Sequence, residues 1–211
     1  MRSRFSYSTT TGDSAENALS LRMFDTAGNE VTFAEPAGNL GAIRFANSTL
    51  DGKLTIAPAG ARIVAYLGAT GTIAGVISGE WTYISQRGLA YDEANDEFYI
   101  GSWNSNKIWR VDNLGVMISS TNFNNVSGLA WHPYGGPGGN GSLWVMENST
   151  CDVVSEIDPN NGWAFIQSFM LPGVVGYGGA GGDIKRSGND AGALWLTNQN
   201  DNTIYLVDLG E

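Results

Sequence analysis

The sequence predicts an all-β protein, specifically a β-propeller of about five four-stranded blades whose first and last blades are incomplete. Three observations lead to this prediction. Short runs of β-branched and aromatic residues recur with a period of roughly 45 residues. Turn-forming Asn, Asp, Gly and Ser residues separate these runs, and no segment keeps the 3.6-residue apolar period of a helix.

The blade pattern is clearest in the middle of the chain. There, four short β-prone runs follow one another at residues 88–92, 97–101, 107–112 and 116–119. The same order returns twice toward the C-terminus, faintly before residue 80, and in part near the N-terminus. We therefore expect a single propeller domain over residues 1–211, with blades at roughly residues 1–36, 40–78, 86–122, 126–171 and 180–211.

The residue that closes the third strand gives the repeats a common register. These closing residues are Asp25, Leu67, Asp112, Asp158 and Asp208. Because an Asp side chain accepts backbone N–H groups in tight turns, we expect the aspartates to stabilise hairpins rather than to take part in catalysis.

Aromatic residues recur on the second and third strands of the repeats. Their large apolar rings are suited to packing between neighbouring sheets, so a place in the core is expected for them. They are Tyr99, Trp109, Trp144, Trp195 and Tyr205.

These motifs are similar to those of a known group. Gly-Leu-Ala-Tyr at residues 88–91, Glu-Phe-Tyr-Ile-Gly at 97–101 and Lys-Ile-Trp-Arg-Val-Asp at 107–112 resemble the blades of secreted and surface bacterial propellers of the NHL and YncE-like kind. The resemblance covers about residues 40–211. It implies the architecture and an extracellular or cell- or particle-surface location, but no particular activity, because such blades support many functions.

The two ends of the chain leave several arrangements open. Residues 2–8 alternate polar and apolar side chains and are predicted to form a strand. That strand either belongs to the incomplete first blade or completes the last blade, which closes the ring by terminal strand exchange. A further alternative is closure by another copy of the chain, or a larger propeller of which this chain is a fragment. Because an open sheet edge invites pairing, the incomplete end blades also predict self-association.

Charge and composition disfavour nucleic acid and membranes as partners. The formal net charge is −10, from 21 acidic and 11 basic side chains, so the chain repels phosphate backbones and anionic lipids. We expect neither a membrane span nor a signal peptide, because no long apolar run is present. Cys151 stands alone, which leaves no intramolecular disulfide and no cysteine-based zinc site.

Residues suited to catalysis are sparse, and no cofactor is expected. The single histidine, His132, precedes a segment rich in Pro and Gly and is expected in a surface loop. Some related propellers are metal-dependent lactonases or lyases, and this enzyme class is the alternative function. Asp183 is the one carboxylate predicted at the start of an inner strand, whereas a calcium or magnesium site needs several oxygen ligands. Residues 92–97 and 198–202 are rich in oxygen ligands for a surface Ca²⁺, although ordinary hairpin turns explain both segments.

The preferred function is a non-catalytic binding or structural module of a surface or extracellular assembly. One loop rim of the propeller combines aromatic rings with amide side chains, which suits recognition of a polypeptide or a glycan. For Trp103, the tryptophan of this rim, an alternative is that its ring packs across the blade edge. The candidate ligand-binding residues are Trp103, Asn104, Asn106, Asn148, Tyr177, Asn198, Gln199 and Asn200.

Overall fold

The structure, a computed structural model, consists of β-strands and connecting turns in the part of the chain that it describes. It describes residues 4–8, 20–24, 30–31, 40–46, 53–58, 63–67, 73–77, 79–81, 86–148, 153–171, 179–184, 192–198 and 200–210, and side chains only from residue 77 onward. None of these residues is in a helix, so none lies in a helix that could span a membrane. The prediction of an all-β protein is confirmed.

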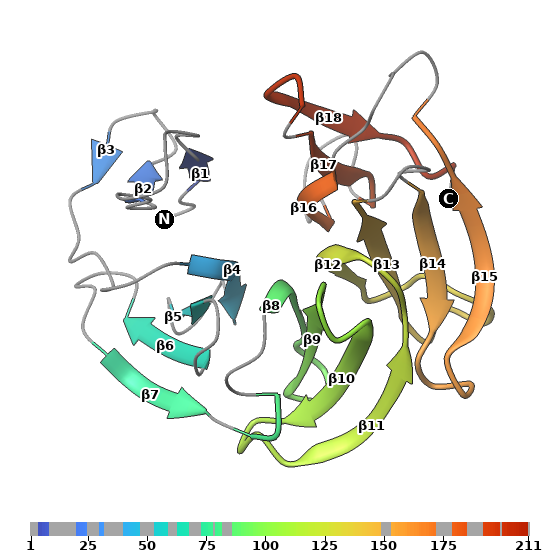
Figure 1. Ribbon diagram of the computed structural model, residues 1–211, viewed down its shortest axis with the longest axis horizontal. Helices are drawn as coiled ribbons and strands as arrows, with labels where there is room; N and C mark the ends of the chain where they lie inside the picture. The colour runs from blue at the N-terminus through green and yellow to red at the C-terminus, as the bar shows by residue number, and fades with distance from the viewer. Residues whose placement is uncertain are drawn as a thin grey trace.

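The strands form five antiparallel sheets that follow one another along the chain (Figure 1). The sheet at the N-terminus contains β1 (Arg4–Ser8), β2 (Ser20–Phe24) and β3 (Glu30–Val31). The second contains β4 (Leu40–Ala46), β5 (Lys53–Pro58), β6 (Ile63–Leu67) and β7 (Ile73–Ile77). The third contains β8 (Gln86–Asp92), β9 (Glu97–Ser102), β10 (Lys107–Asp112) and β11 (Met117–Asn122). The fourth contains β12 (Val126–His132), β13 (Ser142–Glu147), β14 (Val154–Asp158) and β15 (Ala164–Phe169). The last contains β16 (Gly179–Ile184), β17 (Leu194–Asn198) and β18 (Thr203–Val207).

The first strands of successive sheets lie beside one another. β4 contacts β8, β8 contacts β12, and β12 contacts β16. Figure 1 shows β8, β12 and β16 on the inner side of an arc, with β11, β15 and β18 on its outer side. In each of the last three sheets the strands therefore follow one another from the inner to the outer side of the arc, and the turns lie alternately at the two ends of the strands.

The strand near the N-terminus joins the N-terminal sheet. β1 pairs with β2 over its full length, from Arg4 opposite Phe24 to Ser8 opposite Ser20. At the other end of the chain, β18 pairs with β17 and forms the outer edge of its sheet as described. Of the two arrangements expected for residues 2–8, the described strands have the first, and terminal strand exchange onto the last sheet is not the pairing observed.

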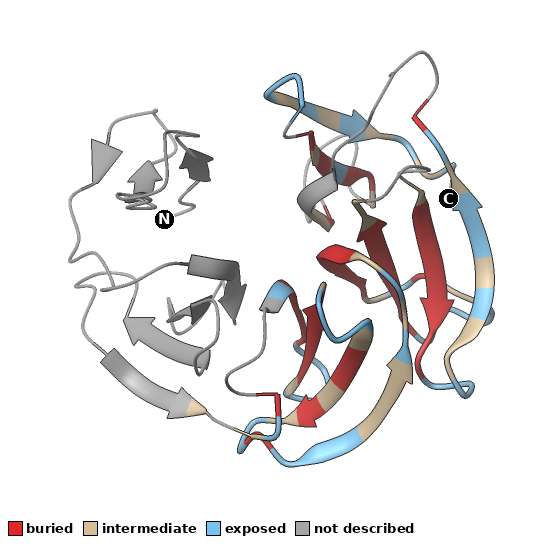
Figure 2. Cartoon of the chain, in the orientation of Figure 1, coloured by how far each residue is buried: buried red, intermediate tan, exposed pale blue. Residues whose placement is uncertain are grey.

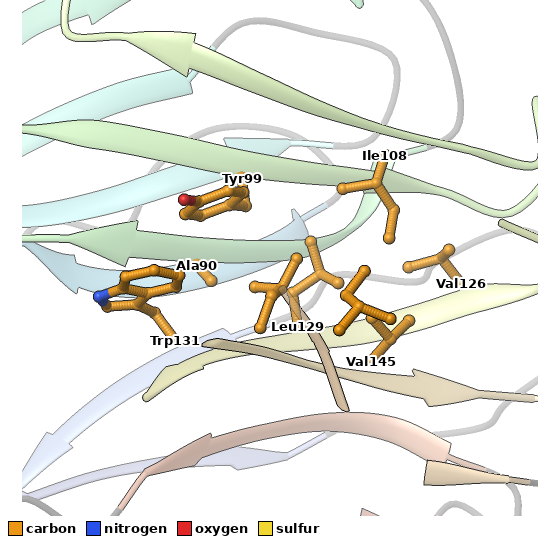
Figure 3. Packing of buried hydrophobic residues seen from close by; sticks show 9 residues of the cluster. Ala90, Tyr99, Ile108, Val126, Leu129, Trp131 and Val145 are labelled. Carbon is orange, nitrogen blue, oxygen red and sulfur yellow. The ribbon is translucent and has the colours of Figure 1, made fainter. Parts of the chain in front are cut away.

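Three apolar clusters fill the spaces between neighbouring sheets. One combines Trp81 with the β8–β11 sheet, and Ile77 at the end of β7 packs against it. A second lies between the β8–β11 and β12–β15 sheets, and Figure 3 shows several of its members. The third lies between β12–β15 and β16–β18 and includes Trp144, Met146 and Leu196. Because burial concentrates on the inner strands while β11 and β15 are largely exposed (Figure 2), each sheet depends on its neighbours to bury its apolar faces.

The aromatic residues divide between the core and the surface. Tyr99, Trp109 and Trp144 are buried, as expected. Trp195 is 38% exposed, so the core prediction is wrong for it, and Tyr205 is half-buried. The reason is strand alternation. The residues on either side of Trp195 face the third cluster, so Trp195 projects from the opposite face of β17.

The aspartates at the ends of the third strands stabilise turns, as expected. In each described case the side-chain oxygen accepts a backbone N–H group two residues further on, which is the geometry of an Asx turn. The bonds run from Leu114 N to Asp112 Oδ1 (2.9 Å), from Asn160 N to Asp158 Oδ1 (2.9 Å) and from Gly210 N to Asp208 Oδ1 (2.9 Å).

The second cluster contains two buried polar atoms. Tyr99 and Trp131 stack with ring centroids 5.1 Å apart, and their hydroxyl oxygen and indole nitrogen lie at the same end of the cluster (Figure 3). Neither atom has a hydrogen-bond partner among the described residues. Burial raises the pKa of Tyr99 well above its ordinary value because the phenolate would lose its hydration.

We expect Tyr99→Phe to leave the free energy of unfolding unchanged or to raise it by about 1 kcal/mol, because the substitution removes a buried hydroxyl that makes no hydrogen bond. Tyr91→Phe is the matched control. The Tyr91 hydroxyl donates to Asp96 Oδ1 at 2.6 Å, so its loss should lower the free energy by about 1 kcal/mol. Urea unfolding of both variants measures the difference. Equal losses at the two sites would show that the Tyr99 hydroxyl is satisfied.

Gly141 lies against the face of Trp131 with φ at +92°. A Cβ atom at this position would collide with the indole ring, and the positive φ would strain any L-residue. Gly141→Ala should therefore lower the free energy of unfolding by more than about 2 kcal/mol. Gly162, with φ at +62° and open space around its Cα, separates the two effects. Gly162→Ala should show only the backbone strain of about 1 kcal/mol in thermal or urea unfolding.

Candidate functional site

The predicted site residues that the structure describes all lie on one rim. Antiparallel pairing places the ends of β9 and β13 at the same edge as the starts of β8 and β12, since Gln86 lies opposite Ser102 and Val126 lies opposite Glu147. His132 lies at the other end of β12, and its Nε2 is 3.9 Å from the place that a Cβ atom on Gly192 would occupy, just before β17. The end of β12 thus lies beside the start of β17, so the last two sheets have the same orientation. We call this edge the asparagine rim. It comprises residues 103–106, 122–125, 148, 198 and 200–202.

Trp103 is half-buried at the turn between β9 and β10. The guanidinium of Arg87, on the inner strand of the same sheet, lies 5.4 Å from the centre of the Trp103 ring, which is a cation–π contact. Asn104 follows on the exposed tip of the turn. The backbone below the tip is fixed, because Ser105 N donates to Ser102 Oγ at 3.3 Å. An aromatic ring and an amide are therefore presented on a defined turn.

Asn106 and Asn148 connect neighbouring sheets at this rim. Asn106 has φ at +47°, and its Oδ1 accepts the backbone N–H of Asn125 at 3.2 Å. Its carbonyl accepts the N–H of Phe123 at 2.9 Å. Asn148 N then donates to the carbonyl of Asn125 at 3.1 Å. Structural hydrogen bonds thus explain Asn106, and Asn148 is half-buried in the same network.

Asn198 caps the turn between β17 and β18. It is buried, and its Oδ1 accepts the N–H of the exposed Asn200 at 3.0 Å. Asp201 accepts the hydroxyl of Tyr205 at 2.7 Å and the N–H of Thr203 at 2.9 Å. The Tyr205 hydrogen bond is the main cause that holds the pKa of Asp201 below its usual range, and the same bond raises the pKa of Tyr205. Tyr177 and Gln199, also predicted for the site, lie outside the described residues.

Sequence reasoning missed three exposed asparagines of the rim, Asn122, Asn124 and Asn202. Asn122 ends β11 and Asn124 lies in the connection to β12, between Asn106 and Asn148 along the rim. The signal was available, because Asn122 and Asn124 lie in the asparagine-rich run Asn-Phe-Asn-Asn at residues 122–125. With Asn104, Asn106 and Asn200, these residues make six exposed asparagines on the described rim.

The acidic turn at residues 92–97 lies on the opposite rim, and its carboxylate oxygens accept hydrogen bonds from the protein. Asp92 accepts Ala94 N at 3.0 Å and Asn95 Nδ2 at 2.7 Å. Asp96 accepts the Tyr91 hydroxyl and Asn113 Nδ2, both at 2.6 Å. Within the described residues, no three His, Cys, Asp or Glu side chains are grouped to hold a metal ion. These hydrogen bonds explain the turn without a calcium ion, which stays an untested alternative.

His132 is not on the surface. It is the last residue of β12, it is 3% exposed, and it pairs with Ser142 on β13, so the expectation of a surface loop is wrong. The strand continues through Trp131 to His132 before the Gly-rich segment begins. Nearby, Ser142 Oγ donates to Glu156 Oε1 at 2.5 Å, and Gln167 Nε2 donates to Glu156 Oε2 at 2.7 Å. The Ser142 hydroxyl is therefore bonded to a buried carboxylate that also accepts a hydrogen bond from Gln167.

Asp183 was expected at the start of an inner strand, but it is half-buried next to the last residue of β16, because this strand already begins at Gly179. Its Oδ1 accepts the N–H of Ile184 at 2.9 Å. The neighbouring positions 181 and 182 are glycines. The described part of β16 thus supplies one carboxylate, which is fewer than the several oxygen ligands of a calcium or magnesium site.

Comparisons with known proteins give a likeness of fold alone. No family model and no curated protein matches the chain. Among solved structures, hydrazine synthase of Kuenenia stuttgartiensis is similar to 81% of this chain, with a TM-score of 0.52 and 14% sequence identity. The chain spans about half of the length of that protein's chain, at 49%. At this identity the similarity concerns the arrangement of strands and carries no activity.

We expect Asn106→Ala to lower the free energy of unfolding by about 1 to 2 kcal/mol. The substitution removes the hydrogen bond from Asn125 N, and alanine tolerates the positive φ of this position less well than asparagine does. Asn106→Gly tolerates the backbone angle and should lose only the hydrogen-bond contribution. Asn104→Ala, on the exposed tip of the same turn, should change the free energy by less than about 0.5 kcal/mol. Urea unfolding of the three variants tests the structural role of Asn106. Identical stability of all three would contradict it.

Proposed function

We propose that the chain is a β-propeller of the NHL and YncE-like kind and that it acts as a non-catalytic binding module of a surface or extracellular assembly. The succession of the inner strands β4, β8, β12 and β16 supports the propeller, as does the alignment of the repeat-closing aspartates in Asx turns. The binding role is supported chiefly by the asparagine rim, where an aromatic ring and exposed amides lie together at the ends of adjacent sheets.

A polypeptide is the ligand that the rim favours. The Arg87 guanidinium lies over one face of the Trp103 ring, 5.4 Å from its centre, so this face is not open for stacking on a sugar. The exposed amides of Asn104, Asn122 and Asn124 can each donate and accept hydrogen bonds, which matches the alternating N–H and C=O groups of an extended peptide. Arg87 also adds a cation to a chain of net charge −10, so acidic or C-terminal carboxylate groups of a peptide would be attracted locally.

The enzyme alternative receives less support. A metal-dependent lactonase or lyase needs several carboxylates or amides that converge on one ion. Among the described residues the inner strands supply two carboxylates, Asp183 on β16 and Asp92 at the end of β8, and both accept hydrogen bonds from neighbouring groups. Binding through the rim is therefore the function that we propose.

Binding to an array of synthetic peptides, with a glycan array in parallel, tests this proposal. The expected result is a peptide ligand whose affinity falls by about tenfold or more in Trp103→Ala, since aromatic residues dominate such interfaces. Trp195→Ala is the matched control, because it removes an equally large ring that is 38% exposed on a sheet face away from the rim. Equal affinity of wild type and Trp103→Ala would contradict the rim as the site. Binding to glycans alone would overturn the polypeptide assignment.

A further inference from the structure

The turns at the rim opposite the asparagine rim contain the dipeptide Asn-Gly at two places. One is Asn140-Gly141, in the connection between β12 and β13, and the other is Asn161-Gly162, in the turn between β14 and β15. Both asparagines are exposed, and the two turns are neighbours, because Asn160 Nδ2 donates to the carbonyl of Asn140 at 3.1 Å. The two dipeptides therefore share solvent and nearby charge, and the local backbone distinguishes them.

An asparagine that precedes a glycine can lose its amide group without an enzyme. The backbone nitrogen of the glycine gives its proton to the solvent and bonds to the asparagine Cγ, which forms a cyclic succinimide. The bond from Cγ to Nδ2 breaks, and Nδ2 leaves as ammonia after it takes a proton from water. A water molecule then opens the ring at either carbonyl carbon, so the product is aspartate or isoaspartate and nothing is oxidised or reduced. Glycine favours this reaction because no Cβ hinders its nitrogen and its backbone is unusually free to rotate.

In the first dipeptide the attacking nitrogen is held in place. Gly141 N donates to the carbonyl of Gly135 at 3.0 Å, which closes the Gly-rich connection on itself. Gly141 is also buried against the face of the Trp131 ring. Attack on Asn140 therefore requires that this hydrogen bond break and that the backbone move away from the indole, which is a local opening of the structure.

In the second dipeptide the attacking nitrogen is not held. Gly162 is exposed and has open space where a Cβ would stand, and its N–H makes no hydrogen bond to any described residue. The bond from Ala164 N to the carbonyl of Asn161, at 3.1 Å, spans this dipeptide. It is the bond that opens when the Asn161 backbone rotates to bring the Gly162 nitrogen to Cγ, and it lies in an exposed turn where such opening is frequent.

From this contrast we propose that Asn161 is a site of spontaneous deamidation, through a succinimide formed with Gly162. Asn140 is protected from the same reaction by the hydrogen bond between Gly141 N and the carbonyl of Gly135. The reaction consumes water alone. The site is separate from the asparagine rim, so the inference goes beyond the proposed rim function and stands if that function fails.

The modification changes both the charge and the backbone of the turn. A carboxylate replaces the amide in the turn that Asp158 caps, on a chain whose net charge is already −10. In the isoaspartate product the main chain runs through the side-chain carbon, which lengthens the turn. Asn160 Oδ1, next to the modified residue, accepts a hydrogen bond from Arg110 Nη1 at 3.0 Å, so the change falls beside a contact that joins the third and fourth sheets.

The experiment compares the two asparagines within the same full chain. One sample is kept folded in mildly alkaline buffer and a second is kept in the same buffer with denaturing guanidinium chloride, and portions are taken over time. A protease that cuts after glutamate separates the two sites, because Glu147 and Glu156 lie between them. Mass spectrometry then measures the replacement of NH2 by OH at each asparagine.

In the folded chain Asn161 should react at least about tenfold faster than Asn140, because attack on Asn140 waits for the local opening at Gly141. In denaturant the two asparagines should react at nearly the same rate, since each precedes a glycine and neither nitrogen is then held. The folded and denatured samples thus separate the effect of the structure from that of the dipeptide.

The variant Gly162→Ala tests the route. Its Cβ hinders the attacking nitrogen, so the rate at Asn161 should fall severalfold while the rate at Asn140 stays as in wild type. Thermal unfolding confirms that the variant is folded, as the open space around Gly162 predicts.

Asn140 that reacts as fast as Asn161 in the folded chain would overturn the proposal. Asn161 that stays intact in the folded chain while it reacts in denaturant would overturn it as well. An unchanged rate at Asn161 in folded Gly162→Ala would exclude the succinimide and with it the proposed reaction.

Discussion

The close approach of the first strands of neighbouring sheets is the constraint on which the described structure depends. A Cβ atom at Gly88 on β8 would lie 2.6 Å from Leu129 Cγ and 3.1 Å from the backbone of Gly128 on β12. A Cβ atom at Gly182 on β16 would collide with Met146 on β13. Glycine at these positions lets one inner strand lie directly against the next sheet, and that contact brings the apolar faces of the sheets together.

Because the sheets meet in this way, stability is shared between neighbours. The stack of Tyr99 on Trp131 joins two sheets, and Trp144 with Leu196 joins the next two. No single sheet of this size buries enough apolar surface alone, so each behaves as one unit of a repeat array stabilised by its interfaces. The shared orientation of the sheets has a second effect, since it gathers turns that are far apart in the sequence on the same rim.

Function is proposed where this repeating arrangement leaves groups uncommitted. Asn106 and Asn148 belong to hydrogen bonds that tie one sheet to the next, and Asn198 caps its own turn. The exposed side chains of Asn104, Asn122 and Asn124, together with Trp103 under Arg87, are where we propose that a ligand binds.

The sequence by itself determined the strands, their order and the Asx turns, because strand propensity, two-residue alternation and the turn chemistry of Asp112, Asp158 and Asp208 are local properties. It also brought Trp103 and the asparagines to notice as candidates. It could not show which asparagines hold the turns through hydrogen bonds of their own side chains, since the bond from Asn125 N to Asn106 Oδ1 spans two strands and a turn. Tertiary structure alone decided that His132 is buried and that Trp195 faces outward, because burial depends on which face of a strand the neighbouring sheet covers. It also decided that β1 pairs with β2, since the choice between sheet edges is a long-range pairing that no local pattern encodes.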